Sequence, residues 1–198
     1  MRPTDHKRRM LPGGWLAAAF RSFIVTQRGD AMVEFALIIP VLVALLVGTF
    51  EVTHLVRTQQ KMERVAGMVG NLVARAESHT EENFQACFDA ASQFAWPHDL
   101  FENGNVIVTS IVGQEEDENP TVLWQQVSED GVTVESRIGS PGKAATLPGG
   151  LGIDEGQGLI VTEVYFDYTP RLAAQMFPAR RLYMQAFHSP RRSAIITM

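Results

Sequence analysis

Cysteine is almost absent from this sequence. Cys87 is the single cysteine among 198 residues, so no disulfide can form within the chain. A fold of this size can do without disulfides even in an oxidising compartment. We therefore expect Cys87 to act as a small buried apolar residue on a helix.

Positive charge is scarce after residue 29. The first 29 residues carry six of the 17 basic residues and one of the 22 acidic ones, which leaves a net charge of −10 on the remainder. Phosphate binding needs clustered lysine and arginine, so this remainder is not expected to bind nucleic acid. The basic segment 1–29 fits the positive-inside rule, which predicts that it stays cytoplasmic while the rest of the chain crosses the membrane.

Signatures of catalysis and of metal binding are also missing. The pair Gly142-Lys143 is not a phosphate loop, because Arg137 stands where the first glycine should be and Ala144 replaces the serine or threonine. The five histidines are scattered, and the acidic run 115–119 lacks the spacing of an EF-hand. No nucleophile elbow is present. The sequence predicts no enzyme, no cofactor and no metal site.

What the sequence does contain is a long stretch without charge, from Phe35 to Phe50. With residues 31–33 it approaches the ~20 apolar residues that span a bilayer as a helix. Core helices of soluble proteins rarely stay apolar on every face for this length. We therefore expect a transmembrane helix over residues 30–50.

Glu34 lies just inside this apolar stretch. An acid at the bilayer centre costs about 2.5–3.5 kcal/mol, and less near the interface, so such a residue usually has a partner. A cut between Gly29 and Asp30 would create an amino group one helical turn from Glu34. The carboxylate could pair with that group or with the amino terminus of a neighbouring subunit, which would fix the register between helices. The alternative is an unpaired glutamate that reaches the interface.

The order of these residues resembles the processing site and helix of type IV pilin-like proteins. Gly29 is followed by Glu34 and Phe35 at the fifth and sixth places, and the apolar run carries Pro40, as pilin-like helices often do. Within that group the chain is most similar to the TadE-like pseudopilins, or minor pilins, of tight-adherence (Flp, type IVb) pilus systems. The main Flp pilin is far shorter and has Glu-Tyr at the position of Glu34-Phe35. This difference favours a pseudopilin over the bulk filament subunit.

The resemblance implies that a prepilin peptidase removes residues 1–29 as a leader, with cleavage after Gly29. Before cleavage the leader either lies on the cytoplasmic face of the inner membrane or is a disordered tail. The implied partners are that peptidase, other pilins or pseudopilins, and the pilus assembly platform; the carboxyl-terminal domain would be periplasmic or enter the pilus. The competing interpretation is an unprocessed single-pass anchor for an extracytoplasmic binding domain.

Residues 51–78 show apolar residues at three- and four-residue spacing, which predicts an amphipathic helix that continues the membrane helix. Its apolar stripe would pack on the folded domain or form a coiled coil with a partner. Gly67 and Gly70 weaken this helix and indicate a bend or close packing.

Residues 79–198 are expected to form an α+β domain, with the long helix packed on a small antiparallel sheet. The pattern predicts a helix at residues 81–96, a long mobile loop at 139–158 and a short helix at 170–177. Aromatic residues in this part, including Trp96, are expected in the sheet and core. Valine, isoleucine and threonine mark candidate strands at residues 105–112, 121–127, 132–138, 159–167, 182–187 and 193–197.

Overall fold

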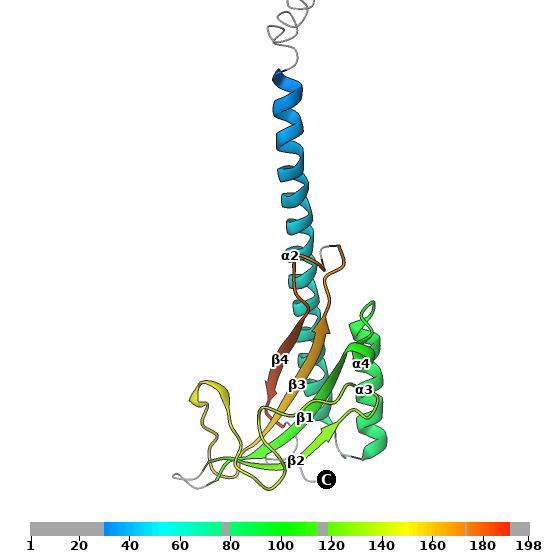
Figure 1. Ribbon diagram of the computed structural model, residues 1–198. Helices are drawn as coiled ribbons and strands as arrows, with labels where there is room; N and C mark the ends of the chain where they lie inside the picture. The colour runs from blue at the N-terminus through cyan, green and yellow to red at the C-terminus, as the bar shows by residue number, and fades with distance from the viewer. Residues whose placement is uncertain (1–29, 77–79, 115–118, 173, 191–198) are drawn as a thin grey trace, which may run out of the picture. The chain divides into compact units, whose positions relative to one another are not determined.

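The computed structural model describes residues 30–76, 80–114, 119–172 and 174–190 (Figure 1). The predicted leader 1–29, most of the acidic run 115–119 and the candidate strand 193–197 lie outside these residues. The chain divides into two units, residues 1–48 and 49–198, and each is described by itself.

The longest element is helix α2, which runs without interruption over Asp30–Arg75 and through Pro40 (Figure 1). The predicted membrane helix and amphipathic helix are therefore one element. Helix α3, Glu81–Ala95, follows, and the hydroxyl of Thr80 caps it by accepting from the backbone N–H of Asn83. A short helix α4, Leu100–Asn103, leads into the sheet. The long helix and the helix predicted at 81–96 are both confirmed.

Four strands form one antiparallel sheet in the order β2-β1-β3-β4. The central strands β1 and β3 pair from Gly104↔Phe166 to Val112↔Gly158. This confirms the predicted α+β class and the antiparallel sheet. The strands are β1 (Gly104–Val112), β2 (Thr121–Val127), β3 (Gly158–Tyr168) and β4 (Arg180–His188).

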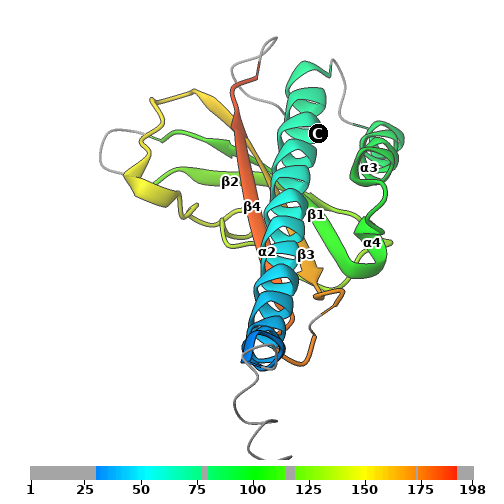
Figure 2. The same cartoon turned by 90° about the horizontal axis from the view of Figure 1, so that it is seen from above.

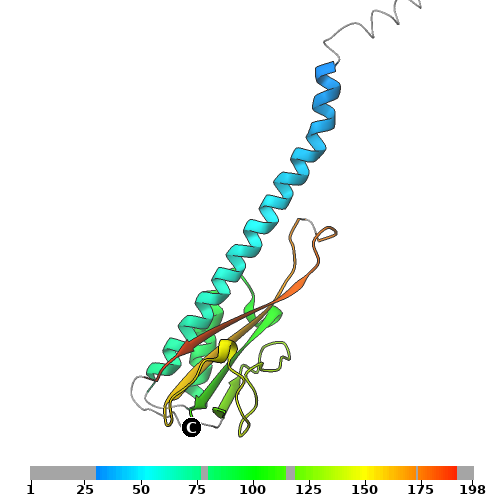
Figure 3. The same cartoon turned by 90° about the vertical axis from the view of Figure 1, so that its left-hand side faces the viewer.

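One face of the sheet is covered by the carboxyl-terminal half of α2 and by α3 (Figures 2 and 3). The predicted apolar stripe of α2 contributes Met62, Val65, Val69 and Val73, all at most 1% exposed. Cys87 lies on α3 against the same core, as predicted, but it is half-buried and not fully buried. The stripe was predicted either to pack on the domain or to form a coiled coil, and the structure shows it packed on the domain.

The buried part of this stripe is shorter than predicted, because its amino-terminal end is exposed. Val52 and Val56 remain 54% and 44% exposed, because the sheet covers α2 chiefly from Met62 onward. Gly70 marks close packing: a Cβ there would lie 2.5 Å from Nδ1 of His188 on β4. Trp96 was wrongly assigned to the core and is 75% exposed, because α3 ends at Ala95.

The other face of the sheet is covered by the chain between β2 and β3. Ile138 and Ala145 of this connection pack on Ile111, Leu159 and Val161 of the sheet. Two backbone hydrogen bonds join it to β2: Val122 N–H donates to the Lys143 carbonyl at 3.0 Å, and Gly142 N–H donates to the Val122 carbonyl at 2.8 Å. The segment predicted as a loop at 139–158 is indeed a connection, with a short 3-10 turn, η1, at Pro148–Gly150.

Two elements predicted from the sequence are not present. Residues 132–138 form no strand, because they cross the second face of the sheet and make side-chain hydrogen bonds instead of pairing at an edge. Residues 170–172 and 174–177 form bends and turns, not a helix. A helix this short is stable only when it packs an apolar face on the fold, and here Leu172 and Met176 remain exposed.

Candidate functional site: the exposed apolar half of helix α2 and two buried carboxylates

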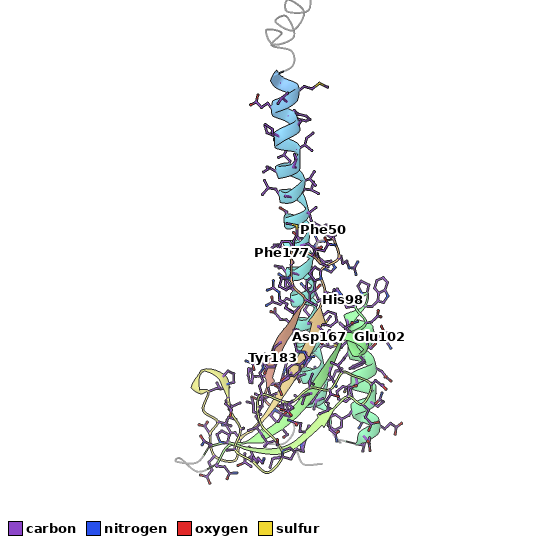
Figure 4. All side chains as sticks on the ribbon, viewed as in Figure 1. Phe50, His98, Glu102, Asp167, Phe177 and Tyr183 are labelled. Carbon is purple, nitrogen blue, oxygen red and sulfur yellow. The ribbon has the colours of Figure 1, made fainter. Side chains whose placement is uncertain are left out.

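The amino-terminal half of α2 exposes apolar side chains on every side. Within the part of the chain that the structure describes, α2 is the one helix long and apolar enough to cross a membrane, and none of its most apolar window is buried. Twelve of its large apolar residues have exposed fractions from 42% to 79%, and Figure 4 shows side chains pointing outward around the helix. They are Met32, Val33, Phe35, Leu37, Ile38, Ile39, Val41, Leu42, Val43, Leu45, Leu46 and Phe50.

Such a surface is far larger than a water-soluble protein normally exposes, and it identifies a segment that needs an apolar environment. The core helix of a soluble domain can be equally long and apolar, but most of such a helix is buried. We therefore treat this half of α2 as a candidate membrane anchor.

The predicted site residues lie at the start of this surface. Asp30 is the first residue of α2, and Glu34, four residues later, lies one turn further along the helix. Glu34 is exposed, Phe35 is 61% exposed, and Pro40 lies inside the helix. Gly29 lies outside the described residues. The roles assigned to these five residues stay predictions.

A buried carboxylate that the sequence analysis missed follows directly after the apolar run. Glu51 is only 3% exposed. Its carboxylate accepts hydrogen bonds from the Tyr168 hydroxyl at 3.2 Å, from Arg171 N–H at 3.4 Å and from Leu172 N–H. Glu51 therefore holds the connection between β3 and β4 against the first turns of α2 that follow Phe50.

Aromatic rings surround this carboxylate. The ring of His54 stacks on Phe50 at 6.3 Å and meets His98 edge-on at 6.0 Å, and its Nδ1 lies 3.1 Å from the Tyr168 hydroxyl. Burial lowers the pKa of His54, and the nearby charge of Arg171 lowers it further. Burial likewise lowers the pKa of His98, with a smaller contribution from His54. Both rings are therefore harder to protonate in the folded chain than in the unfolded one.

This pKa change predicts that the domain loses stability as pH falls below about 6.5, the ordinary pKa of histidine. Unfolded histidines bind protons more readily than His54 and His98 do in the fold, so acid favours the unfolded chain, whereas the full stability is present above 6.5. We expect the melting temperature of the full-length protein in detergent to fall between pH 7.5 and 5.5. A His98→Phe variant, which keeps the ring against Phe166, should lose less over the same interval. Equal losses would contradict this assignment.

A second buried carboxylate, Glu163 on β3, lies on the opposite face of the sheet and is 0% exposed. It accepts from Arg137 N–H at 3.0 Å, from the Tyr183 hydroxyl at 2.9 Å and from the hydroxyl of Ser136. The Tyr165 hydroxyl lies 3.1 Å away. Burial raises the pKa of both tyrosines, and the charge of Glu163 raises it further, so they remain hydrogen-bond donors.

These two clusters hold backbone segments in place and contain no recognisable catalytic arrangement. Across residues 30–76, 80–114, 119–172 and 174–190, no group of three histidine, cysteine, aspartate or glutamate side chains could hold a metal ion. Sequence alone gave one usable sign of each cluster. Glu51 is the first charge after the apolar run, and Glu163 interrupts the apolar and threonine-containing residues 159–166 of β3.

The comparisons with known proteins bear on the first part of α2. No curated protein sequence and no solved structure matches the chain. Residues 29–69 match the family model described as TadE-like protein. That range begins at Gly29, includes Glu34, Phe35 and Pro40, and ends inside the buried stripe of α2. The match confirms the resemblance predicted from the sequence, and over residues 29–69 the chain is similar to TadE-like proteins.

Proposed function

We propose that this chain is a pseudopilin or minor pilin that takes part in the assembly of a tight-adherence pilus. Residues 30–50 span the inner membrane, and the basic segment 1–29 is a cytoplasmic leader. The helix extension 51–78 and the domain 79–198 are periplasmic. A prepilin peptidase cuts after Gly29. The protein acts by packing against other subunits and is not an enzyme.

The observation that carries this proposal is the apolar surface of residues 31–50, exposed on all sides of the helix. In the bilayer this surface is solvated by lipid tails, and in an assembly it packs against similar helices of other subunits. The TadE-like match over the same residues supports the second use. The excess of basic residues before Gly29 supports the orientation.

Glu34 supplies the specificity that apolar packing lacks. Lipid tails are as apolar as leucine, so apolar side chains alone select neither a partner helix nor the axial register between two helices. A carboxylate in this apolar environment is stabilised most by a cationic partner. The amino group that cleavage releases at Asp30 is such a partner, because it lies one helical turn from Glu34. Pairing within one chain or between neighbouring subunits then fixes where the helices meet.

We expect Glu34→Ala to spare trimming but to lower incorporation into the pilus or its assembly complex about tenfold or more. Tenfold corresponds to about 1.4 kcal/mol, and breaking a pair in a low-dielectric site costs at least that much. The measurement is the amount of trimmed protein that co-purifies with the assembled fraction. Glu63→Ala, which removes an exposed glutamate of the same helix outside the apolar run, is the matched control and should have no effect. Normal incorporation of Glu34→Ala would refute the pairing.

The proposed function is tested by deleting the gene and counting surface pili in electron micrographs. We expect few or no pili in the deletion strain and recovery with the wild-type chain. A strain that makes pili normally without this protein would contradict a role in assembly and favour the unprocessed membrane-anchored domain.

A further inference from the structure

The connection between β3 and β4, residues 169–179, has an unusual composition for this domain. The part of the chain after residue 29 is strongly acidic, yet no acidic residue occurs from Tyr168 to the carboxyl terminus. The connection contains Leu172, Met176 and Phe177, and Arg171 and Arg180 lie on either side of these residues. A short apolar segment between arginines is the composition of surfaces that contact anionic lipid.

Two of its large apolar side chains do not contribute to the core. Leu172 is 62% exposed and Met176 is 70% exposed. Figures 1 and 3 show the connection projecting beyond the ends of β3 and β4. Exposing these side chains to water costs free energy, and contact with an apolar phase would remove that cost.

The connection is fixed to α2 at one level of the helix. The carboxylate of Glu51 accepts from the backbone N–H groups of Arg171 and Leu172. Phe177 and Pro178 line a small pocket of about 50 Å³ together with Val52 and Leu55 of α2. Figure 4 labels Phe50 and Phe177, which both lie at the end of the domain where residues 49–55 of α2 are found.

That level coincides with the end of the apolar run. Phe50 is its last residue and Glu51 is the first charged one, so a helix that spans the bilayer leaves the hydrocarbon close to this point. Whatever is hydrogen-bonded to Glu51 lies at the boundary between lipid and water. Arg181 is already engaged, since its guanidinium makes two 2.7 Å hydrogen bonds to Asp167. Of the three arginines within or directly beside the connection, Arg171 and Arg180 are exposed and in a position to face the headgroups.

We propose that the β3–β4 connection is a lipid-contact surface that seats the domain on the membrane which α2 spans. Leu172 and Met176 enter the boundary between headgroups and acyl chains, and Arg171 and Arg180 contact the phosphates of anionic lipids. This inference rests on the proposed membrane span. Lipid is favoured over a second copy as the occupant, because the hydrogen bonds to Glu51 hold the connection at the bilayer whether or not another subunit is present.

The test uses the full-length chain, one copy per lipid nanodisc, with phosphatidylglycerol and a fraction of nitroxide-labelled lipid. In a Cys87→Ser background, a fluorescent label is placed on Met176→Cys, on Leu42→Cys within the span, or on Leu151→Cys. Leu151 is the matched control, because it is 47% exposed and is expected to lie in water. It precedes β3, whereas the β3–β4 connection follows the opposite end of that strand. We expect the lipid to quench the labels at 42 and 176 several-fold more than the label at 151.

Each outcome decides a separate question. Quenching at 42 with water-like behaviour at 176 would overturn the lipid contact and leave the span intact, whereas no quenching at 42 would refute both. Protection of the label at 176 only in discs that hold two copies would assign this surface to a neighbouring subunit and also overturn the proposal. Arg171→Gln combined with Arg180→Gln should reduce quenching at 176 at least twofold without changing quenching at 42.

Discussion

Gly29→Leu should leave the chain at its full length in cells that contain a working prepilin peptidase. Glycine has no side chain, so the backbone on either side of the proposed cut can approach an enzyme closely, and a leucine side chain would block that approach. The trimmed wild-type product should be about 3 kDa smaller, since 29 of the 198 residues of this 21.9-kDa chain are removed. Immunoblots against the carboxyl-terminal domain would separate the two forms.

The control for this substitution is Gly48→Leu in the same helix. A Cβ at Gly48 meets no atom within 4 Å, so leucine adds one more apolar side chain to an apolar surface. This variant should be trimmed like the wild type. A Gly29→Leu chain that appears at the smaller size in normal amount would mean that the cut lies elsewhere.

Glu163→Leu should destabilise the domain by about 3 kcal/mol. The substitution leaves Arg137 N–H and the Ser136 hydroxyl without their acceptor, whereas the Tyr183 hydroxyl can still donate to Gln185. Each unsatisfied buried group costs about 1–3 kcal/mol. The added apolar volume and the removal of a buried charge offset part of that loss. For a chain of this length, about 3 kcal/mol corresponds to a fall of about 10 °C in melting temperature. Tryptophan fluorescence of the full-length protein in detergent would measure it.

Glu135→Leu is the matched control, because Glu135 belongs to the same segment but its side chain is exposed. We expect a change in stability below about 0.5 kcal/mol for this variant. If Glu163→Leu melted at the wild-type temperature, the carboxylate would not be what holds residues 135–138 over the second face of the sheet.

The elements that could be predicted from the sequence are those with local signals. The uncharged run that ends at Phe50 has the length of a membrane helix, and the apolar stripe from Met62 to Val73 follows helical spacing. The helix was therefore predicted over residues 30–78, against an observed Asp30–Arg75. The strands β1 to β4 are rich in β-branched residues and lie between turn residues, and their observed limits differ from the predicted ones by at most two residues.

What could not be predicted depends on contacts between distant residues. Residues 132–138 have the composition of a strand, but their place over the second face of the sheet depends on Glu163, more than twenty residues away. Glu51 and Glu163 are acids, which sequence reasoning places in water, and only partners such as Tyr168 and Tyr183 make their burial possible. Whether residues 170–177 form a helix likewise depends on packing against distant residues, and the exposed side chains of Leu172 and Met176 provide no packed face for one.

The central claim is that a leader is removed at Gly29 so that an apolar helix beginning at Asp30 can assemble with others. Mass spectrometry of the amino-terminal peptide, taken from the membrane fraction of cells that make pili, tests it most directly. The account predicts a mature chain that starts at Asp30. A stable chain that still begins at Met1, in cells whose peptidase trims other substrates, would contradict it.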